Sequence, residues 1–322
     1  MRRPFRGRAA LGGMMKVTVR AATHTGKVRD HNEDYYTALG ETESPPGVNA
    51  LLVVADGMGG HAAGEVASKM TVEGIVQSLN DQSEVVSKLE GNAFGAFLGK
   101  VLEEVNQDVW RAGQESEKLG MGTTCTLAAI RGGQLYLAHI GDSRAYLFRN
   151  GELHQVSKDH SWVEDAVDQG VITREQARIH PNRNVITRAI GLDPQPKIDT
   201  SAMALADGDL LLLCSDGLNS MIPDEDIHSI LTSSGPEDVC QALIDAANAQ
   251  GGHDNTTVVV AAIGARRKTP AVIQPSAAEL DTQEIFRGQS WWKRLSKTIG
   301  RRRRIPTLSQ SIRNAYTHYN PP

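Results

Sequence analysis

The sequence predicts an α+β fold in which antiparallel β-sheets are covered by helices. Short apolar stretches with strand character come in groups, and turns of the hairpin type connect them. Long stretches with helical periodicity separate these groups instead of following every strand, as they would in a wound parallel sheet. The chain has 322 residues, 40% of them hydrophobic, which is enough to bury a substantial core.

The predicted strands are short apolar runs bounded by turn residues. The runs 51–55 and 210–214 are uniformly apolar and are predicted to be buried strands. Asn150 and Gly151 separate two strand-like runs and predict a hairpin, because a tight two-residue turn needs positive φ at both central residues. The predicted strands cover 17–22, 51–55, 134–140, 144–148, 152–156, 210–214 and 256–263.

Three stretches have the apolar spacing of amphipathic helices. Residues 64–79 place Val66, Met70 and Ile75 on one broad face. Residues 94–109 repeat apolar side chains at intervals of three and four. A third helix is expected over 236–249, with Pro236 in its first turn, where the N–H that proline lacks has no helical partner.

The chain divides into a basic arm, a domain of catalytic size and a basic tail. Residues 1–16 carry five Lys or Arg and no acid, and form either a flexible arm or the product of an upstream start codon. Residues 17–264 hold the dense periodicity of the predicted domain. Residues 265–322 hold twelve Lys or Arg against three acids, with a Pro-containing linker over 269–278 and a short basic amphipathic helix predicted over 285–299.

Composition excludes several classes of protein. No apolar run approaches the roughly 18–20 residues that span a bilayer, so an integral membrane protein is excluded. The three cysteines form no CxxC pair and are too few for a disulfide framework, which favours a reducing cytoplasm. The predicted domain carries a net charge of −18, which does not suit a nucleic-acid backbone but suits divalent cations.

Four aspartates lie where apolar strands meet turns: Asp56, Asp142, Asp216 and Asp254. A carboxylate beside a buried strand needs donors, a cation or a turn to cap, and four together indicate a shared cation site. The donors are hard oxygens without Cys or paired His nearby, so Mn²⁺ or Mg²⁺ is favoured over zinc. Gly57 has no side chain, which lets its backbone turn and its carbonyl approach a metal beside Asp56.

A charged cluster upstream adds further candidates. Arg29 offers a planar guanidinium that suits phosphate oxygens. Glu33 and Asp34 offer carboxylates that hold a metal directly or through its waters.

The order of these motifs resembles that of the bacterial type 2C (PPM-type) metal-dependent Ser/Thr protein phosphatases. The resemblance covers about residues 17–264 and implies two packed antiparallel sheets flanked by helices, an α-β-β-α sandwich. The motifs are Arg29-x-x-Asn32-Glu33-Asp34, Asp56-Gly-Met-Gly-Gly-His61, Gly122-Thr123-Thr124, Gly141-Asp142-Ser143-Arg144, Asp159-His160-Ser161, Ser215-Asp216-Gly217-Leu218 and Asp254-Asn255-Thr256.

The resemblance implies a binuclear metal centre. Asp56 would bridge two ions, Asp216 and Asp254 would complete the first, and the carbonyl of Gly57 would bind the second. Glu33 matches a carboxylate that binds the second ion, often through water in bacterial relatives.

The remaining roles are implied in the same way. Asp142 with Asp216 would hold a third, weaker ion, Arg29 would hold the substrate phosphate, and Asp34 would orient a metal-bound water. The position at which animal members carry a His proposed as general acid is Met58 here, with His61 three residues on, so the proton donor is either a side chain still to be identified or a bound water. Residues 160–184 match a flap that tunes substrate choice.

The predicted function is hydrolysis of phosphoserine and phosphothreonine in proteins by a water or hydroxide that bridges two Mn²⁺ or Mg²⁺ ions, opposing a Ser/Thr protein kinase. The alternative is a catalytically weak phosphoprotein-binding pseudophosphatase; a metal-dependent nuclease conflicts with the acidic domain. A monomer in the cytoplasm is expected. The basic tail predicts contact with anionic lipid, an acidic partner or the acidic domain itself, or a disordered extension.

Overall fold

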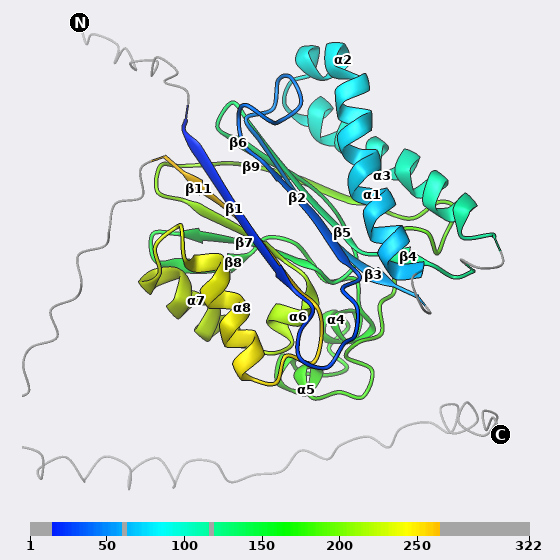
Figure 1. Ribbon diagram of the computed structural model, residues 1–322, viewed down its shortest axis with the longest axis vertical. Coiled ribbons are helices and arrows are strands. Elements are labelled where there is room, and N and C mark those ends of the chain that lie inside the picture. The colour runs from blue at the N-terminus through cyan, green and yellow to red at the C-terminus, as the bar shows by residue number, and fades with distance from the viewer. Residues whose placement is uncertain (1–14, 60–62, 116–118, 265–322) are drawn as a thin grey trace, which may run out of the picture. The chain divides into compact units, whose positions relative to one another are not determined.

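Two antiparallel sheets lie face to face in the computed structural model, with helices on both outer faces (Figure 1). The structure describes residues 15–59, 63–115 and 119–264. Residues 1–14 of the predicted arm over 1–16, the whole predicted tail over 265–322 and His61 lie outside the described residues.

Sheet 1 has five strands in the order β1-β11-β10-β7-β8, and each neighbouring pair is antiparallel. Sheet 2 has the order β2-β3-β5-β6-β9, and β4 pairs with the end of β3. The strands of sheet 1 are β1 (Val17–His24), β7 (Arg144–Arg149), β8 (Glu152–Gln155), β10 (Leu210–Cys214) and β11 (Thr256–Ile263). Those of sheet 2 are β2 (Asp34–Leu39), β3 (Ala50–Met58), β4 (Gly122–Thr123), β5 (Cys125–Arg131), β6 (Gln134–Ile140) and β9 (Asp199–Ala204).

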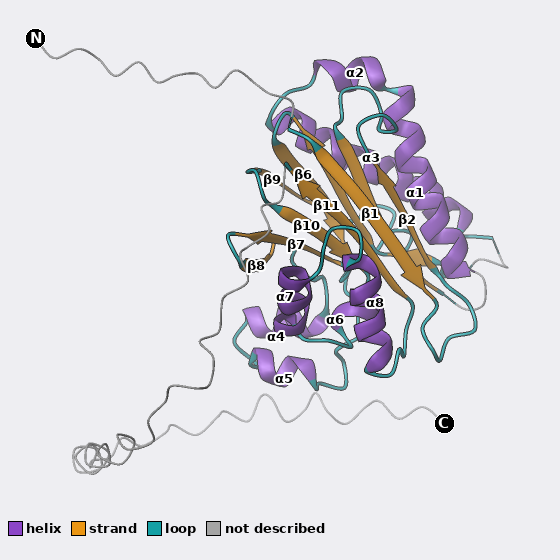
Figure 2. Ribbon diagram, turned by 60° about the vertical axis from the view of Figure 1, so that its left-hand side comes forward, coloured by secondary structure: helices purple, strands orange, loops and turns teal. Residues whose placement is uncertain are grey.

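The helices form the two outer layers and a smaller group near one end of the sheets (Figure 2). The helices α1 (Ala63–Asp81), α2 (Ser83–Lys88) and α3 (Asn92–Ala112) lie on the side of sheet 2. On the side of sheet 1 lie α6 (Asp216–Asn219), α7 (Asp224–Ser233) and α8 (Val239–Ala249). The short helices α4 (Trp162–Asp168) and α5 (Arg174–Arg178) lie between β8 and β9 in the chain.

Three cores hold the four layers together, and alternate side chains of one strand serve different cores. In β10, Leu212 packs toward α7 and α8, whereas Leu211 and Leu213 pack between the sheets. In β3, Leu52 and Val54 face the other sheet, and their neighbours face α1 and α3. Both faces of these strands are buried, which explains their unbroken apolar runs and confirms the predicted α-β-β-α sandwich.

The elements predicted within 17–264 are present, and their bounds differ most at the end of β3 and at the start of α8. The Asn150-Gly151 hairpin is confirmed, with φ of 54° and 83° at its two central residues. Strand β3 continues past Asp56 to Met58, because β4 pairs with its last two residues. Helix α8 begins at Val239, and Pro236 lies before it, because the chain turns at Gly235, whose carbonyl accepts from the N–H of Asp238 and of Val239.

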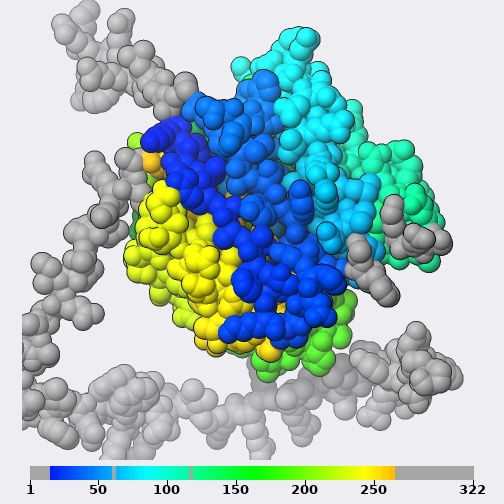
Figure 3. Space-filling view, in the orientation of Figure 1, coloured from blue at the N-terminus to red at the C-terminus, as the bar shows by residue number. Residues whose placement is uncertain are grey.

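On one face of the molecule, the first described residues, in blue, lie between α1 in cyan and the α7–α8 region in yellow (Figure 3).

No helix in the described part of the chain is long and apolar enough to cross a membrane.

Candidate metal-dependent active site

Aspartates from both sheets converge at the end of the sandwich where the sheets approach each other. Asp34 and Asp56 are direct partners in the β2–β3 register. Asp216 follows β10, and Asp254 lies two residues before β11. Strands β10 and β11 are neighbours in sheet 1. A hydrogen bond of 2.7 Å from Ser215 Oγ to Asp34 Oδ2 joins the two groups across the sheets.

Asp142 enters the same cluster from a crossing between the sheets. It lies between β6 of sheet 2 and β7 of sheet 1, and it is buried with 7% of its surface exposed. Its Oδ1 and the Oδ1 of Asp34 are buried without a hydrogen-bond partner among the described residues. Two unpartnered carboxylate oxygens in one buried cluster are costly unless a cation or water joins them.

Burial and mutual repulsion favour the protonated form of these carboxyl groups. Burial raises the pKa of Asp56 well above its ordinary value, and the charges of Asp34, Asp216, Asp142 and Asp254 raise it further. Burial, reinforced by Asp216 and Asp254, raises the pKa of Asp34 to about 7. The pKa of Asp216 rises to about 6, mainly through burial and then through Asp254. Asp56 is thus the electrostatic centre of the cluster.

The chemistry of this donor set fits divalent cations that prefer oxygen. Carboxylate oxygens are the ligands that Mg²⁺ and Mn²⁺ take in proteins, and a bound cation removes the repulsion that raises these pKa values. Among the described residues, no group of three or more His, Cys, Asp or Glu side chains already has the spacing of a metal site. The fit to a cation therefore depends on the oxygen donors and on the two unpartnered carboxylate oxygens.

Gly57 follows Asp56 inside β3, where close packing leaves no space for a side chain. A Cβ at this position would lie 2.5 Å from the carbonyl oxygen of Glu33 and closer still to that of Gly64. Its φ is not in the left-handed region, so the expectation of a turn at Gly57 is wrong. The glycine is required because β3, the loop before β2 and the first turn of α1 meet at this point.

Arg29 lies at the exposed rim of the cluster. Its guanidinium donates a hydrogen bond of 2.7 Å to Asp254 Oδ2, and 51% of its side chain is exposed. Glu33 is partly buried nearby, and burial raises its pKa while the charge of Arg29 acts in the opposite direction. The structure therefore brings all eight predicted site residues to one end of the sandwich.

Neutral side chains that the sequence analysis left without a role hold this arrangement. Thr124 Oγ1 accepts from the N–H of Asp56 at 2.9 Å and shares a hydrogen bond of 2.7 Å with Ser143 Oγ. Asn255 accepts from the N–H of Glu33 and donates to the carbonyls of Thr25 and His31, so it fixes the loop that carries Arg29 and Glu33. All three residues stand in the quoted motifs, Ser143 and Asn255 directly after an aspartate, which is the sequence signal that identifies them.

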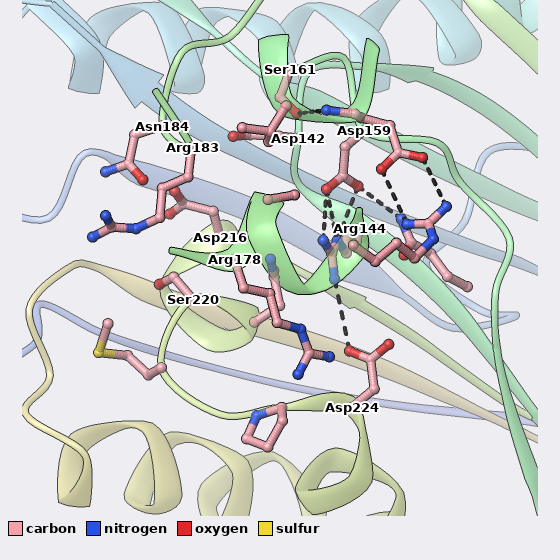
Figure 4. Close-up of a pocket in the computed structure, with 18 of the residues that line it drawn as sticks. Asp142, Arg144, Asp159, Ser161, Arg178, Arg183, Asn184, Asp216, Ser220 and Asp224 are labelled. Atoms are coloured by element: carbon pink, nitrogen blue, oxygen red, sulfur yellow. Dashed lines mark hydrogen bonds and ion pairs between the residues drawn. The ribbon is translucent and has the colours of Figure 1, made fainter. Parts of the chain in front are cut away.

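A pocket with a volume of about 390 Å³ adjoins the cluster, lined by residues of α4, α5, α6 and the chain that follows them (Figure 4). Asp142 and Asp216 line it from the aspartate cluster, and the exposed side chains of Arg178 and Arg183 line it from the flap over 160–184. Arg144 is held beside it by three hydrogen bonds to Asp159. The flap contains the helices α4 and α5. Each helix is preceded by a capping residue, Ser161 or Thr173, whose hydroxyl accepts a hydrogen bond from a backbone N–H of the first turn.

No cysteine is available as a nucleophile at this site. Cys125, Cys214 and Cys240 are all free and buried. Burial raises the pKa of each thiol, which keeps it protonated and unreactive.

Comparisons with known proteins identify the family. The family profile described as Protein phosphatase 2C matches residues 24–261. The chain is 38% identical over 241 residues to the serine/threonine phosphatase stp of Listeria monocytogenes, covering 74% of this chain and 92% of that protein.

Solved structures agree with this match. The S. agalactiae serine/threonine phosphatase has a TM-score of 0.70 and 34% identity, covering 76% of this chain and 99% of that one. The catalytic domain of PstP in complex with two manganese ions has a TM-score of 0.65 and 36% identity, covering 78% of this chain and all of that one. The chain therefore belongs to the protein phosphatase 2C family, as a serine/threonine phosphatase of the bacterial type.

Proposed function

We propose that this phosphatase hydrolyses phosphoserine and phosphothreonine in proteins by direct attack of water, with Mn²⁺ or Mg²⁺ held by the aspartate cluster. The observation that carries the proposal is the convergence of five mutually repelling aspartates from both sheets at one buried point. The PstP catalytic domain in complex with two manganese ions supports the choice of metal.

We assign the metal ligands as follows. Asp56, at the centre of the cluster, would hold both ions; Asp216 and Asp254 would complete the site of the first, and the Gly57 carbonyl with Glu33 would hold the second. Asp142 with Asp216 would hold a third, weaker ion, and the unpartnered Oδ1 of Asp142 supports this role. When bound, such ions make hydroxide available near neutral pH and neutralise the phosphoryl charge.

Two residues of the chain act on the reactants directly. Arg29 is the residue that binds the substrate phosphate. Its exposed guanidinium lies at the rim of the cluster and can replace its hydrogen bond to Asp254 by one to a phosphate oxygen. Asp34 accepts a hydrogen bond from the attacking water through Oδ1, while Ser215 holds its Oδ2. The water oxygen bonds to phosphorus as the bond from phosphorus to the Ser or Thr oxygen breaks, that oxygen takes up a proton to give the alcohol, and phosphate is released without a phosphoenzyme.

The substrate is a phosphoprotein whose chain lies along the pocket between the aspartates and the flap. Four arginines line this pocket. Arg174 is paired with Glu164 and Arg144 with Asp159. Arg178 and Arg183 then supply the positive charge on the side of the pocket that the flap forms. We expect the substrates to be targets of a Ser/Thr protein kinase in the cytoplasm.

The test is hydrolysis of p-nitrophenyl phosphate and of a phosphothreonine peptide with added Mn²⁺, with EDTA, and after thiol alkylation. We expect activity with Mn²⁺, none with EDTA, and no loss on alkylation because the three thiols are buried. Full activity after exhaustive chelation would refute the metal-dependent mechanism. Phosphopeptide binding without turnover in saturating Mn²⁺ would favour the pseudophosphatase.

A further inference from the structure

His160, in the first residues of the flap, is a buried imidazole joined to the turn that carries Asp142. Only 1% of its surface is exposed. Its backbone N–H donates to the carbonyl of Gly141 at 2.7 Å, and its ring Nδ1 accepts from the N–H of Gly141 at 3.1 Å. His160 therefore satisfies both backbone groups of the residue immediately before Asp142.

These bonds define which ring nitrogen carries the proton. Because the Gly141 N–H is a donor, Nδ1 must be unprotonated, and the proton of the neutral ring is on Nε2. Nε2 lies 3.1 Å from Asp199 Oδ2 and donates to it. Arg188 Nη1 donates to the other oxygen of Asp199 at 3.2 Å and also lies 3.1 Å from His160 Nε2, so Asp199 is the acceptor that both donors share. Asp199 thus selects the tautomer that the Gly141 contact needs.

Gly141 is also confined from the opposite side. Its φ is +109°, and a Cβ there would lie 2.5 Å from Thr124 Cβ. Thr124 is the residue whose hydroxyl accepts from the N–H of Asp56. The Gly141 peptide is therefore held between Thr124 and the ring of His160. This leaves the Asp142 carboxylate little freedom to move.

We propose that His160 is a positioning residue for Asp142: its Nδ1 holds the Gly141 amide, Asp199 holds its Nε2–H, and the pair aims the Asp142 carboxylate into the cluster. Because only 1% of the His160 surface is exposed, the ring acts through Asp142 and does not touch the substrate. This inference rests on the proposed role of Asp142 as the ligand of the weak ion. Partners that orient a ligand typically change metal affinity or activity by about 10- to 100-fold when they are lost.

The test compares His160→Asn with His160→Gln in the full chain. Asn places a polar atom where Nδ1 lies and can accept from Gly141, whereas Gln places one where Nε2 lies and loses that contact. We expect His160→Gln to weaken the weakest Mn²⁺ site about tenfold and leave the tight sites unchanged. His160→Asn should bind Mn²⁺ within about threefold of the parent at every site. The readout is free Mn²⁺ measured by electron paramagnetic resonance during titration of the protein.

A second set of variants separates the explanations. Asp142→Ala is the reference and should abolish the weak site; if it does not, the proposed ligand role fails. If Asp142→Ala abolishes the site but His160→Gln retains it, the inference about His160 fails alone. Equal losses in His160→Asn and His160→Gln would show that the ring only fills space.

Asp199→Ala covers the case in which a His160 variant does not fold, because the Asp199 side chain is 39% exposed and lies further from the cluster. Without Asp199 the Nε2–H tautomer loses its acceptor, and Arg188 remains at Nε2 as a donor, so the weak site should bind Mn²⁺ several-fold less tightly. Unchanged affinity in Asp199→Ala would overturn the proposal.

Discussion

The buried carboxylates of the cluster repel one another, and the chemistry proposed for this protein depends on cations that offset this repulsion. Burial raises the pKa of Asp34, Asp56 and Asp142, and the charges of neighbouring aspartates raise each of these pKa values further. Divalent cations would convert this repulsion into ligand binding. The individual residues therefore differ in what their removal should change: the ligands should affect the chemical step, and Arg29 should affect substrate binding.

Replacing Asp216 by Asn should abolish most turnover while leaving the fold intact. The amide keeps the size of the side chain but removes a charge that holds metal, and a loss of about 4 kcal/mol of transition-state stabilisation lowers kcat about a thousandfold. The measurement is kcat on p-nitrophenyl phosphate in saturating Mn²⁺. Asp108→Asn on the exposed face of α3 is the control and should retain full activity; a kcat of Asp216→Asn within tenfold of the parent would contradict the ligand role.

Replacing Arg29 by Ala should instead raise KM, with kcat changing only a few-fold. A guanidinium that clamps phosphate contributes equally to the bound substrate and to the transition state. Arg111→Ala, another exposed arginine, should leave both constants unchanged. A large fall in kcat at constant KM would show that Arg29 acts in the chemical step.

At the scale of elements, the site depends on how closely β3 approaches its neighbours. Strand β3 runs into the cluster with its register fixed by β2 on one side and by β5 on the other. Its end is covered by the first turn of α1, which approaches so closely that only glycine fits at position 57. This contact brings the Gly57 carbonyl and Glu33 to the same place.

Gly57→Ala should therefore destabilise the protein even without metal. Adding a methyl group to a close-packed contact typically costs about 1–3 kcal/mol. The measurement is urea unfolding in EDTA. Gly40→Ala is the matched control and should be neutral, because the nearest atom to its added Cβ is 3.7 Å away. Equal stability of the two variants would show that the β3–α1 contact can relax.

At the scale of the whole molecule, the cluster couples stability to pH. The folded pKa of Asp34 is about 7 and that of Asp216 about 6, against 3.8 for an ordinary Asp. A carboxyl group whose pKa is higher when folded contributes stability that is complete below the unfolded value and is lost as pH rises through the folded value.

The free energy of unfolding in EDTA should therefore fall between about pH 4 and pH 7. Mn²⁺ at 100 times its dissociation constant should then add about 2.7 kcal/mol near pH 7. The measurement is chemical unfolding at each pH, with the double variant Asp34→Asn, Asp216→Asn as control. A parent profile as flat as that of the double variant would contradict the pKa shifts.

Removal of residues 265–322 should leave turnover of small phosphoesters within about twofold of the full chain, because a folded catalytic domain needs only its own core. The last strand ends at Ile263, and the matched family region ends at residue 261. The measurements are kcat on p-nitrophenyl phosphate and, separately, binding to anionic vesicles. Loss of turnover in a folded truncation would assign the tail to the catalytic domain, and unchanged vesicle binding would exclude the tail as a lipid-binding segment.

The sequence by itself determined the class of the fold and the residue types of the site. Apolar runs such as 210–214 predict strands because burial on both faces leaves no polar alternation. Strand-end aspartates beside glycines predict a cation site, because isolated carboxylates there would be unstable. The strands β2, β4, β5 and β9 were not predicted. Strand β2 begins in a charged cluster, β4 has two residues, and the runs of β5 and β9 include polar residues, so none has a clear period.

Only the tertiary structure decided how these residues meet. Asp34 lies opposite Asp56 because of the β2–β3 register, and Asp216 reaches them because sheet 1 packs on sheet 2. The need for glycine at position 57 and the contact between His160 and Gly141 depend on segments that are distant in sequence. Local patterns encode which face of a strand is buried, whereas register and packing between sheets depend on the simultaneous fit of many side chains, which no local pattern contains.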